Sequence, residues 1–104
     1  MDIYNTFITA INTKRVVSIE YDSYEKGIIS RLCIPFDYGM SRRYKDGKER
    51  YHLYSLDGPN GSHNISILPE QLLSIRVTNE HFEPSDYITW DTNWIVERDW
   101  GEYS

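Results

Sequence analysis

The chain has 104 residues, a net charge of −5 at pH 7 and a single cysteine. This length leaves room for one hydrophobic core rather than two, the acidic charge argues against general binding to duplex DNA, and a lone Cys33 excludes an intrachain disulfide. A lone thiol suits a reducing compartment, and no apolar run approaches the roughly 18–20 residues of a membrane span. We therefore expect a cytoplasmic protein that makes no contact with a membrane.

The first segment has the pattern of an amphipathic helix. The apolar side chains that recur at helical spacing are Ile3, Phe7, Ile8 and Ile11. Asp2 is placed to cap the first turn, and Lys14 and Arg15 suit the negative end of the helix dipole. The sequence therefore predicts a helix over residues 2–13 whose apolar side covers a sheet.

Period-two alternation then predicts six short strands. Their ranges are 16–22, 28–36, 37–44, 50–56, 64–68 and 72–78. Pro35 lacks an amide donor, so we expect it to end the second strand or to lie at an edge. Asp46-Gly47 is typical of a type I′ turn and predicts a tight hairpin between Ser41–Lys45 and Lys48–Ser55. The segment 69–71 is predicted to form one tight turn.

One helix followed by these strands predicts an α+β fold that is mainly β. We expect a small antiparallel SH3-like or Sm-like barrel or a strongly curled sheet, because closure removes exposed strand edges. The alternative is a helix packed on an open antiparallel sheet. We expect residues 1–104 to form a single domain with its core at about 3–85. The aromatic, acidic segment at about 86–104 is expected to pack on that core.

Residue types that support catalysis or metal binding form no recognisable motif. His52, His63 and His81 lack metal-ligand spacing, and no Gly-rich phosphate loop precedes a helix. Cys33 lies between two apolar residues, which is typical of a buried small hydrophobe rather than a nucleophile. We therefore expect a non-enzymatic chain with no catalytic residue, no metal site and no cofactor.

Positive charge is concentrated between Arg42 and Arg50, where five bases stand against two acids and the local net charge is +3. Flat rings stack on unpaired bases while Lys and Arg follow the phosphates, which is how small barrels hold single strands. The expected ligand is a nucleotide or single-stranded nucleic acid. The candidate ligand-binding residues in this segment are Arg42, Arg43, Tyr44, Lys45, Lys48, Arg50, Tyr51 and Tyr54. The alternative is a solvated hairpin whose charges protect a strand edge.

The C-terminal residues suggest a function of a different class. From Glu80 to Ser104 the chain carries seven acids and one base, a local net charge of −6, together with large rings such as Trp94 and Trp100. Because aromatic residues are enriched at interface cores, a structural or protein–protein interaction subunit, or a homodimer, is the alternative to a ligand-binding module. An equally valid interpretation is that these aromatic side chains pack on the sheet of their own chain.

Four short motifs resemble the WYL domain family. They are Ala10-Ile11, Val17-x-Ile19-x-Tyr21, Arg31-x-x-x-Pro35 and Tyr51-His52-Leu53. Residues 65–75 and Phe82 match later apolar positions, with Ile65 where the family carries an arginine. The resemblance spans about residues 3–85. Its strand order implies that Arg31 lies close to the basic segment, which makes Arg31 a ninth candidate ligand-binding residue. The resemblance also implies an SH3-like, Sm-like barrel that serves as a bacterial-type regulatory or ligand-sensing module, here without the helix-turn-helix that usually precedes such domains.

Overall fold

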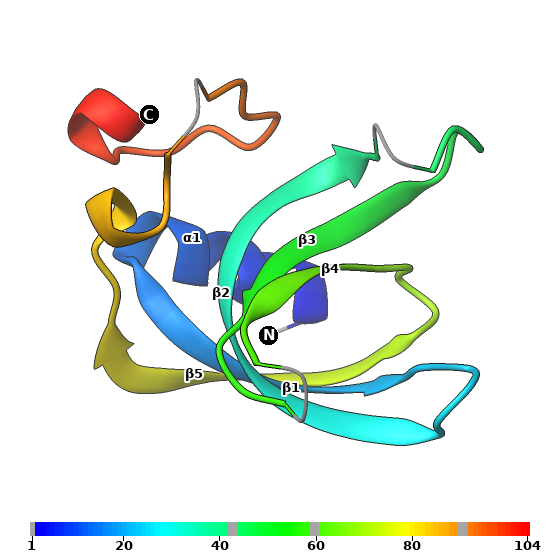
Figure 1. The fold of residues 1–104 in the computed structure, drawn as a ribbon. Helices are drawn as coiled ribbons and strands as arrows, with labels where there is room; N and C mark the ends of the chain where they lie inside the picture. Colours follow the sequence, from blue (N-terminus) through cyan, green and yellow to red (C-terminus); the bar gives the residue numbers. More distant parts are fainter. Residues whose placement is uncertain (1, 42–43, 59–60, 90–91) are drawn as a thin grey trace.

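The computed structural model describes residues 2–41, 44–58, 61–89 and 92–104. One helix, α1 (Ile3–Thr13), precedes five strands. The strands are β1 (Arg15–Asp22), β2 (Ile28–Met40), β3 (Glu49–Ser55), β4 (His63–Ile67) and β5 (Leu72–His81). They form one antiparallel sheet in the order β4-β3-β2-β1-β5 (Figure 1). The predicted α+β, mainly β class is confirmed, and the sheet is not closed into a barrel within the described residues.

The N-terminal helix forms as its sequence predicts. The Asp2 carboxylate accepts the Asn5 amide at 2.7 Å, and Lys14 ends the helix in the left-handed conformation with φ 53°. The side chains that α1 buries completely against β1, β2 and β5 are Phe7, Ala10 and Ile11. In the described part of the chain, no helix has the length and apolar character needed to cross a membrane.

The two strands predicted over 28–36 and 37–44 are one 13-residue strand, β2. Pro35 does not end it, so that prediction is wrong in part. Strand β1 pairs with β2 only as far as Cys33, which lies opposite Val17, and beyond that point only β3 borders β2. The register with β3 shifts between Pro35 and Asp37. The missing proline amide therefore falls at a locally free edge and a bulge, where no neighbouring strand requires it.

The predicted two-residue hairpin at Asp46-Gly47 is also wrong in its length. The last pair between β2 and β3 is Met40 with Glu49, so residues 41–48 form the loop, of which 42–43 lie outside the described residues. The Asp46 carboxylate accepts the Lys48 amide at 3.0 Å, and Gly47 has φ 73°. This side-chain turn closes the loop locally, and it replaces the backbone pairing that a tight hairpin would need.

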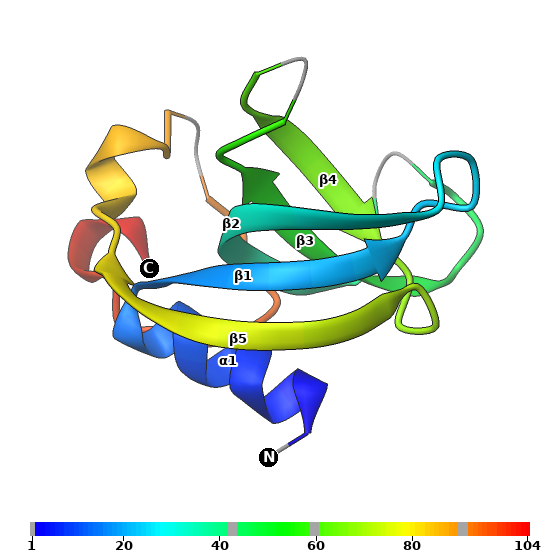
Figure 2. The ribbon, with the colours of Figure 1, turned by 90° about the horizontal axis from the view of Figure 1, so that it is seen from below.

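A short turn joins the two outermost strands of the sheet. Residues 68–71 lead from β4 to β5, and the amides of Gln71 and Leu72 donate to the Leu68 carbonyl as the predicted turn requires. The Gln71 side chain also donates to the Asp22 carbonyl at 2.9 Å, while the Asp22 amide donates to the Gln71 carbonyl. Because this turn connects opposite edges of one sheet, the sheet has to curl, and β3 and β4 turn away from β1 and β5 (Figure 2).

The curl gives the sheet two unlike sides. The inner side faces α1 and carries Tyr51 and Leu53, and the outer side of β2 and β3 is covered by the C-terminal residues. Trp100 is 3% exposed, and its indole Nε1 donates to the Ile11 carbonyl at 2.8 Å. Ile88 is buried as well. The described residues after β5 therefore pack on the body of the protein.

Candidate nucleotide-binding groove

The nine predicted ligand-binding residues do not form one surface. Arg31 lies near the start of β2, opposite Ile19, whereas Tyr44, Lys45, Lys48 and Arg50 lie in or beside the loop beyond the other end of β2. Arg42 and Arg43 lie outside the described residues. The prediction that Arg31 joins the basic loop is wrong, because most of the length of β2 separates them.

Two of the predicted stacking rings are engaged inside the protein. Tyr51 is 5% exposed, and its ring packs edge-on against Phe7 at a centroid distance of 4.8 Å. Tyr54 is half-buried between Phe36 and Tyr87. Neither ring offers a free face for stacking on a base. The alternation along β3 places these rings on opposite sides, but it does not reveal that both sides are covered.

Arg50, near the start of β3, is neutralised by Asp46 in the preceding loop. Its guanidinium donates to both oxygens of Asp46, at 3.0 and 2.9 Å, and lies 4.3 Å from the centroid of the Tyr44 ring. The hydrogen bond from Arg50 lowers the pKa of Asp46 to about 2, so this pair is ionised at neutral pH. Arg50 therefore orders the loop, and the exposed bases Lys45 and Lys48 carry its remaining positive charge in the described part.

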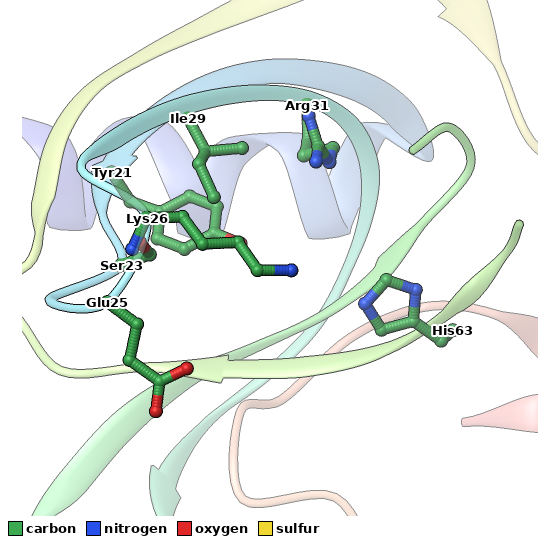
Figure 3. Close-up of a pocket in the computed structure, with 7 residues that line it drawn as sticks. All are labelled: Tyr21, Ser23, Glu25, Lys26, Ile29, Arg31 and His63. Atoms are coloured by element: carbon green, nitrogen blue, oxygen red, sulfur yellow. The ribbon is translucent and has the colours of Figure 1, made fainter. Parts of the chain in front are cut away.

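A different set of side chains meets at the mouth of the curled sheet (Figure 3). Lys26 from the β1–β2 turn, Arg31 from β2 and His63 from the start of β4 surround an open cavity of about 200 Å³. The ring of Tyr21 forms part of the wall, and Glu25 lies on the same rim. We call these residues the mouth. Two permanent cations face one carboxylate there, so the mouth has the charge of an anion site.

A larger cavity adjoins the mouth and shares Tyr21, Ser23 and Glu25 with it. We call it the groove; its volume is about 960 Å³. The strand residues that line it include Phe36 and Asp37 of β2, Arg50 and His52 of β3, and Ile65 and Ser66 of β4. Tyr44 borders it from the loop, and residues 93–95 border it from the C-terminal segment. The groove thus combines apolar surface with amide and hydroxyl groups, as small-molecule sites do.

His52 fixes the floor of the groove. Its Nδ1 lies 2.9 Å from the Ser66 hydroxyl and its Nε2 lies 2.9 Å from the Gly39 carbonyl oxygen. With a proton on Nε2 the ring donates to the carbonyl and accepts from the hydroxyl, which links β2, β3 and β4. The imidazole therefore holds three strands together, and both of its ring nitrogens are engaged in these structural hydrogen bonds.

Cys33 is not an activated nucleophile. Its side chain is fully buried, and burial raises the pKa of the thiol to about 12. The thiolate that nucleophilic attack requires is thus not formed at neutral pH. Across the ranges that the structure describes, no group of three His, Cys, Asp or Glu side chains is arranged to hold a metal ion.

Sequence reasoning missed Lys26 and His63. They lie 37 positions apart, one in a turn and the other at the first position of a strand, so no local pattern connects them. Only the curl of the sheet brings the start of β4 opposite the β1–β2 turn. Arg31 is the one mouth residue among the nine predicted ligand-binding residues.

Comparisons with protein-family models, curated proteins and solved structures give no match for this chain. The resemblance to WYL domains accordingly stays a prediction that its short motifs carry. The mouth and the groove are interpreted from their own geometry.

Proposed function

We propose that this chain is a non-enzymatic regulatory module of WYL-like type, and that its ligand is a nucleotide or a short single-stranded nucleic acid bound at the mouth. The observation that carries the proposal is the convergence of Lys26, Arg31 and His63 on one open cavity (Figure 3). Convergent bases at an opening are notable in a chain whose net charge is −5.

The mouth provides the two kinds of contact that a nucleotide needs. Arg31 Nη1 donates to the Ser30 carbonyl at 2.8 Å, and the other guanidinium donors can bind a phosphate, to which Lys26 adds a second positive charge. Tyr21 supplies an aromatic face beside them, and the groove beyond it has amide and hydroxyl groups for a base or sugar. Stacking contributes about 1–3 kcal/mol per base, so one ring and a few phosphate contacts give modest, salt-sensitive affinity.

The barrel that this proposal assumes is supported by connectivity. The turn at residues 68–71 joins β4 to β5, which are opposite edges of the sheet, and so holds the two edges together at one end. At the other end β4 stands opposite the β1–β2 turn across the mouth. We interpret the fold as an SH3-like barrel that is open on the side of the ligand site.

The test is an NMR titration at low salt with adenosine monophosphate, a thymidine tetranucleotide and inorganic phosphate as separate probes. We expect amide shifts at Tyr21, Lys26, Arg31 and His63, with either nucleotide binding tighter than phosphate. Equal binding of all three probes would indicate a plain anion site. Shifts that are absent, or that cluster in the 44–50 loop, contradict the proposal.

A matched pair of variants sharpens the result. Arg31→Ala removes the mouth guanidinium, whereas Arg76→Ala removes an exposed guanidinium from β5, at a position opposite Ser18 and outside both cavities. Only Arg31→Ala should weaken nucleotide binding. It should also make the slope of log K against log salt concentration less steep by about 0.7 for each lost phosphate contact. Equal losses of nucleotide affinity in both variants would show that the net charge of the protein, and not the mouth, determines binding.

A further inference from the structure

Residues 92–98 cross the outer side of β2 between two buried anchors, Ile88 before them and Trp100 after them. We call these residues the strap. Asn93, Trp94 and Ile95 form the wall of the groove at the end away from the mouth. The strap therefore belongs to the groove although it is far from the mouth in sequence.

The backbone of the strap is held to the sheet by a single carboxylate. Asp37 on β2 accepts the amide of Ile95 at 2.9 Å and the amide of Val96 at 2.8 Å. No backbone–backbone hydrogen bond joins the described strap residues to a strand. Trp94 stacks on Phe36 and Ile95 packs over Gly39, so side-chain packing adds to this contact. The hydrogen bonds from the strap backbone to the sheet nevertheless converge on one carboxylate, unlike those of a ladder strand, which are distributed along its length.

The third partner of Asp37 fits imperfectly. The Arg98 side chain is 1% exposed and lies between two indole rings, 4.0 Å from the centroid of Trp94 and 4.4 Å from that of Trp100. Its only bond to Asp37 is long, at 3.4 Å, and its Nη1 is buried without a hydrogen-bond partner. Its Nε and Nη2 also donate to the Val96 carbonyl, at 3.2 and 3.1 Å. Asp37 is nevertheless the carboxylate that compensates its charge, so the buried guanidinium becomes an uncompensated charge once Asp37 loses its own.

We propose that the strap is releasable: Asp37 latches it, and lifting it opens the end of the groove between Tyr44 and Ile95. The two anchors stay buried while residues 92–98 move. The inference rests on the proposed function for its ligand, since a mononucleotide needs only the mouth and the adjoining part of the groove, whereas a longer strand needs the end that the strap closes. The strap is thus an autoinhibitory contact for longer ligands. Its exposed acid Glu97 adds to this effect by repelling phosphates.

The latch itself is tested without any ligand. Asp37→Asn is compared with Asp99→Asn, which removes the same charge from an exposed position just beyond the strap. Hydrogen exchange should show about 100-fold lower protection of the Ile95 and Val96 amides in Asp37→Asn alone, with β2 and β3 unchanged. Unchanged protection at Ile95 and Val96, or an equal loss throughout the sheet, overturns the latch.

Two further variants keep the test decisive should Asp37→Asn fold poorly. Arg98→Met keeps a long side chain between the indole rings and removes the unpartnered donor, so the strap amides should stay as protected as in the parent chain. The double variant D37N/R98M should recover most of the protection that Asp37→Asn loses, because no uncompensated buried charge remains. Loss of protection in Arg98→Met would mean that the arginine, rather than Asp37, holds the strap.

Ligand length then tests the autoinhibition. Asp37→Asn should bind the thymidine tetranucleotide about 3–10-fold tighter than the parent chain, and it should bind adenosine monophosphate equally well. The reason is that a closed state lowers the apparent affinity only of ligands that need the open state. Equal tetranucleotide affinity in both proteins overturns the autoinhibition. If the parent chain binds neither nucleotide, the proposed function fails, and hydrogen exchange still decides the latch separately.

Discussion

Replacing Trp100 with Phe should destabilise the whole protein, not only its C-terminal segment. The change removes the indole donor that bonds the Ile11 carbonyl at 2.8 Å in a buried position. That carbonyl also accepts the Lys14 amide at 3.3 Å, so it keeps a partner and the loss is at the low end, about 1 kcal/mol. The smaller ring leaves unfilled space beside Phe82 that costs about 1–2 kcal/mol more. The expected total is about 2–3 kcal/mol in the free energy of unfolding.

Urea denaturation followed by far-UV circular dichroism measures this loss, because the signal comes from the helix and sheet rather than from the substituted indole. Trp94→Phe is the matched control, since the Trp94 indole donates to the Tyr103 carbonyl in a half-buried position and should cost less than about 1 kcal/mol. A Trp100→Phe loss no larger than that of Trp94→Phe would refute the reasoning. Trp100 would then lie outside the cooperative core, and the strap would lack its second anchor.

Three other predictions follow from the described contacts. The pair of Asp46 and Arg50 should stabilise the loop at neutral pH. Because the pKa of Asp46 falls from 3.8 to about 2, this stabilisation is complete above pH 4 and is lost as the pH falls through about 2. An NMR titration of the Asp46 carboxyl carbon should show a higher midpoint in Arg50→Gln than in the parent chain. The Cys33 thiol, whose pKa burial raises to about 12, should not react with a thiol reagent at pH 8 until urea unfolds the chain. Light scattering should find a monomer, and a dimer that dissociates when Ile95 is replaced by Ser would favour the interaction-subunit alternative.

Elements with a strong local pattern were predictable. The helix follows from the spacing of Phe7 and Ile11 and from the capping carboxylate of Asp2, and β1 follows from its alternation. Strand β3 was also predicted, but its predicted partner over 41–45 lies in the loop, and β3 pairs instead with residues 33–40 of β2. Asp46 can form either a tight turn or a side-chain turn, and the choice depends on its bond to Arg50, which a dipeptide pattern does not contain.

The candidate site was much less predictable, because its residues meet through the curl of the sheet. The density of bases along the chain pointed to residues 42–50, where Arg50 on β3 forms an ion pair with Asp46 of the preceding loop. The mouth draws one base from a turn, one from β2 and one from β4, so none of these segments is basic by itself. Arg31 was found only through a family resemblance. Sequence charge counts detect runs, whereas binding sites on a curled sheet are assembled across strands.

Pro35 connects the fold to the latch. Leu53 and Tyr51 both face the inner side of β3; their partners on β2 are Pro35 and Tyr38, three positions apart, because the register shifts between Pro35 and Asp37. Without that shift, Asp37 would pair with Tyr51 and point toward α1. With it, Asp37 lies opposite His52 on the outer side, where it accepts the strap amides. A one-residue bulge at a proline therefore places a carboxylate where the C-terminal segment can bind it.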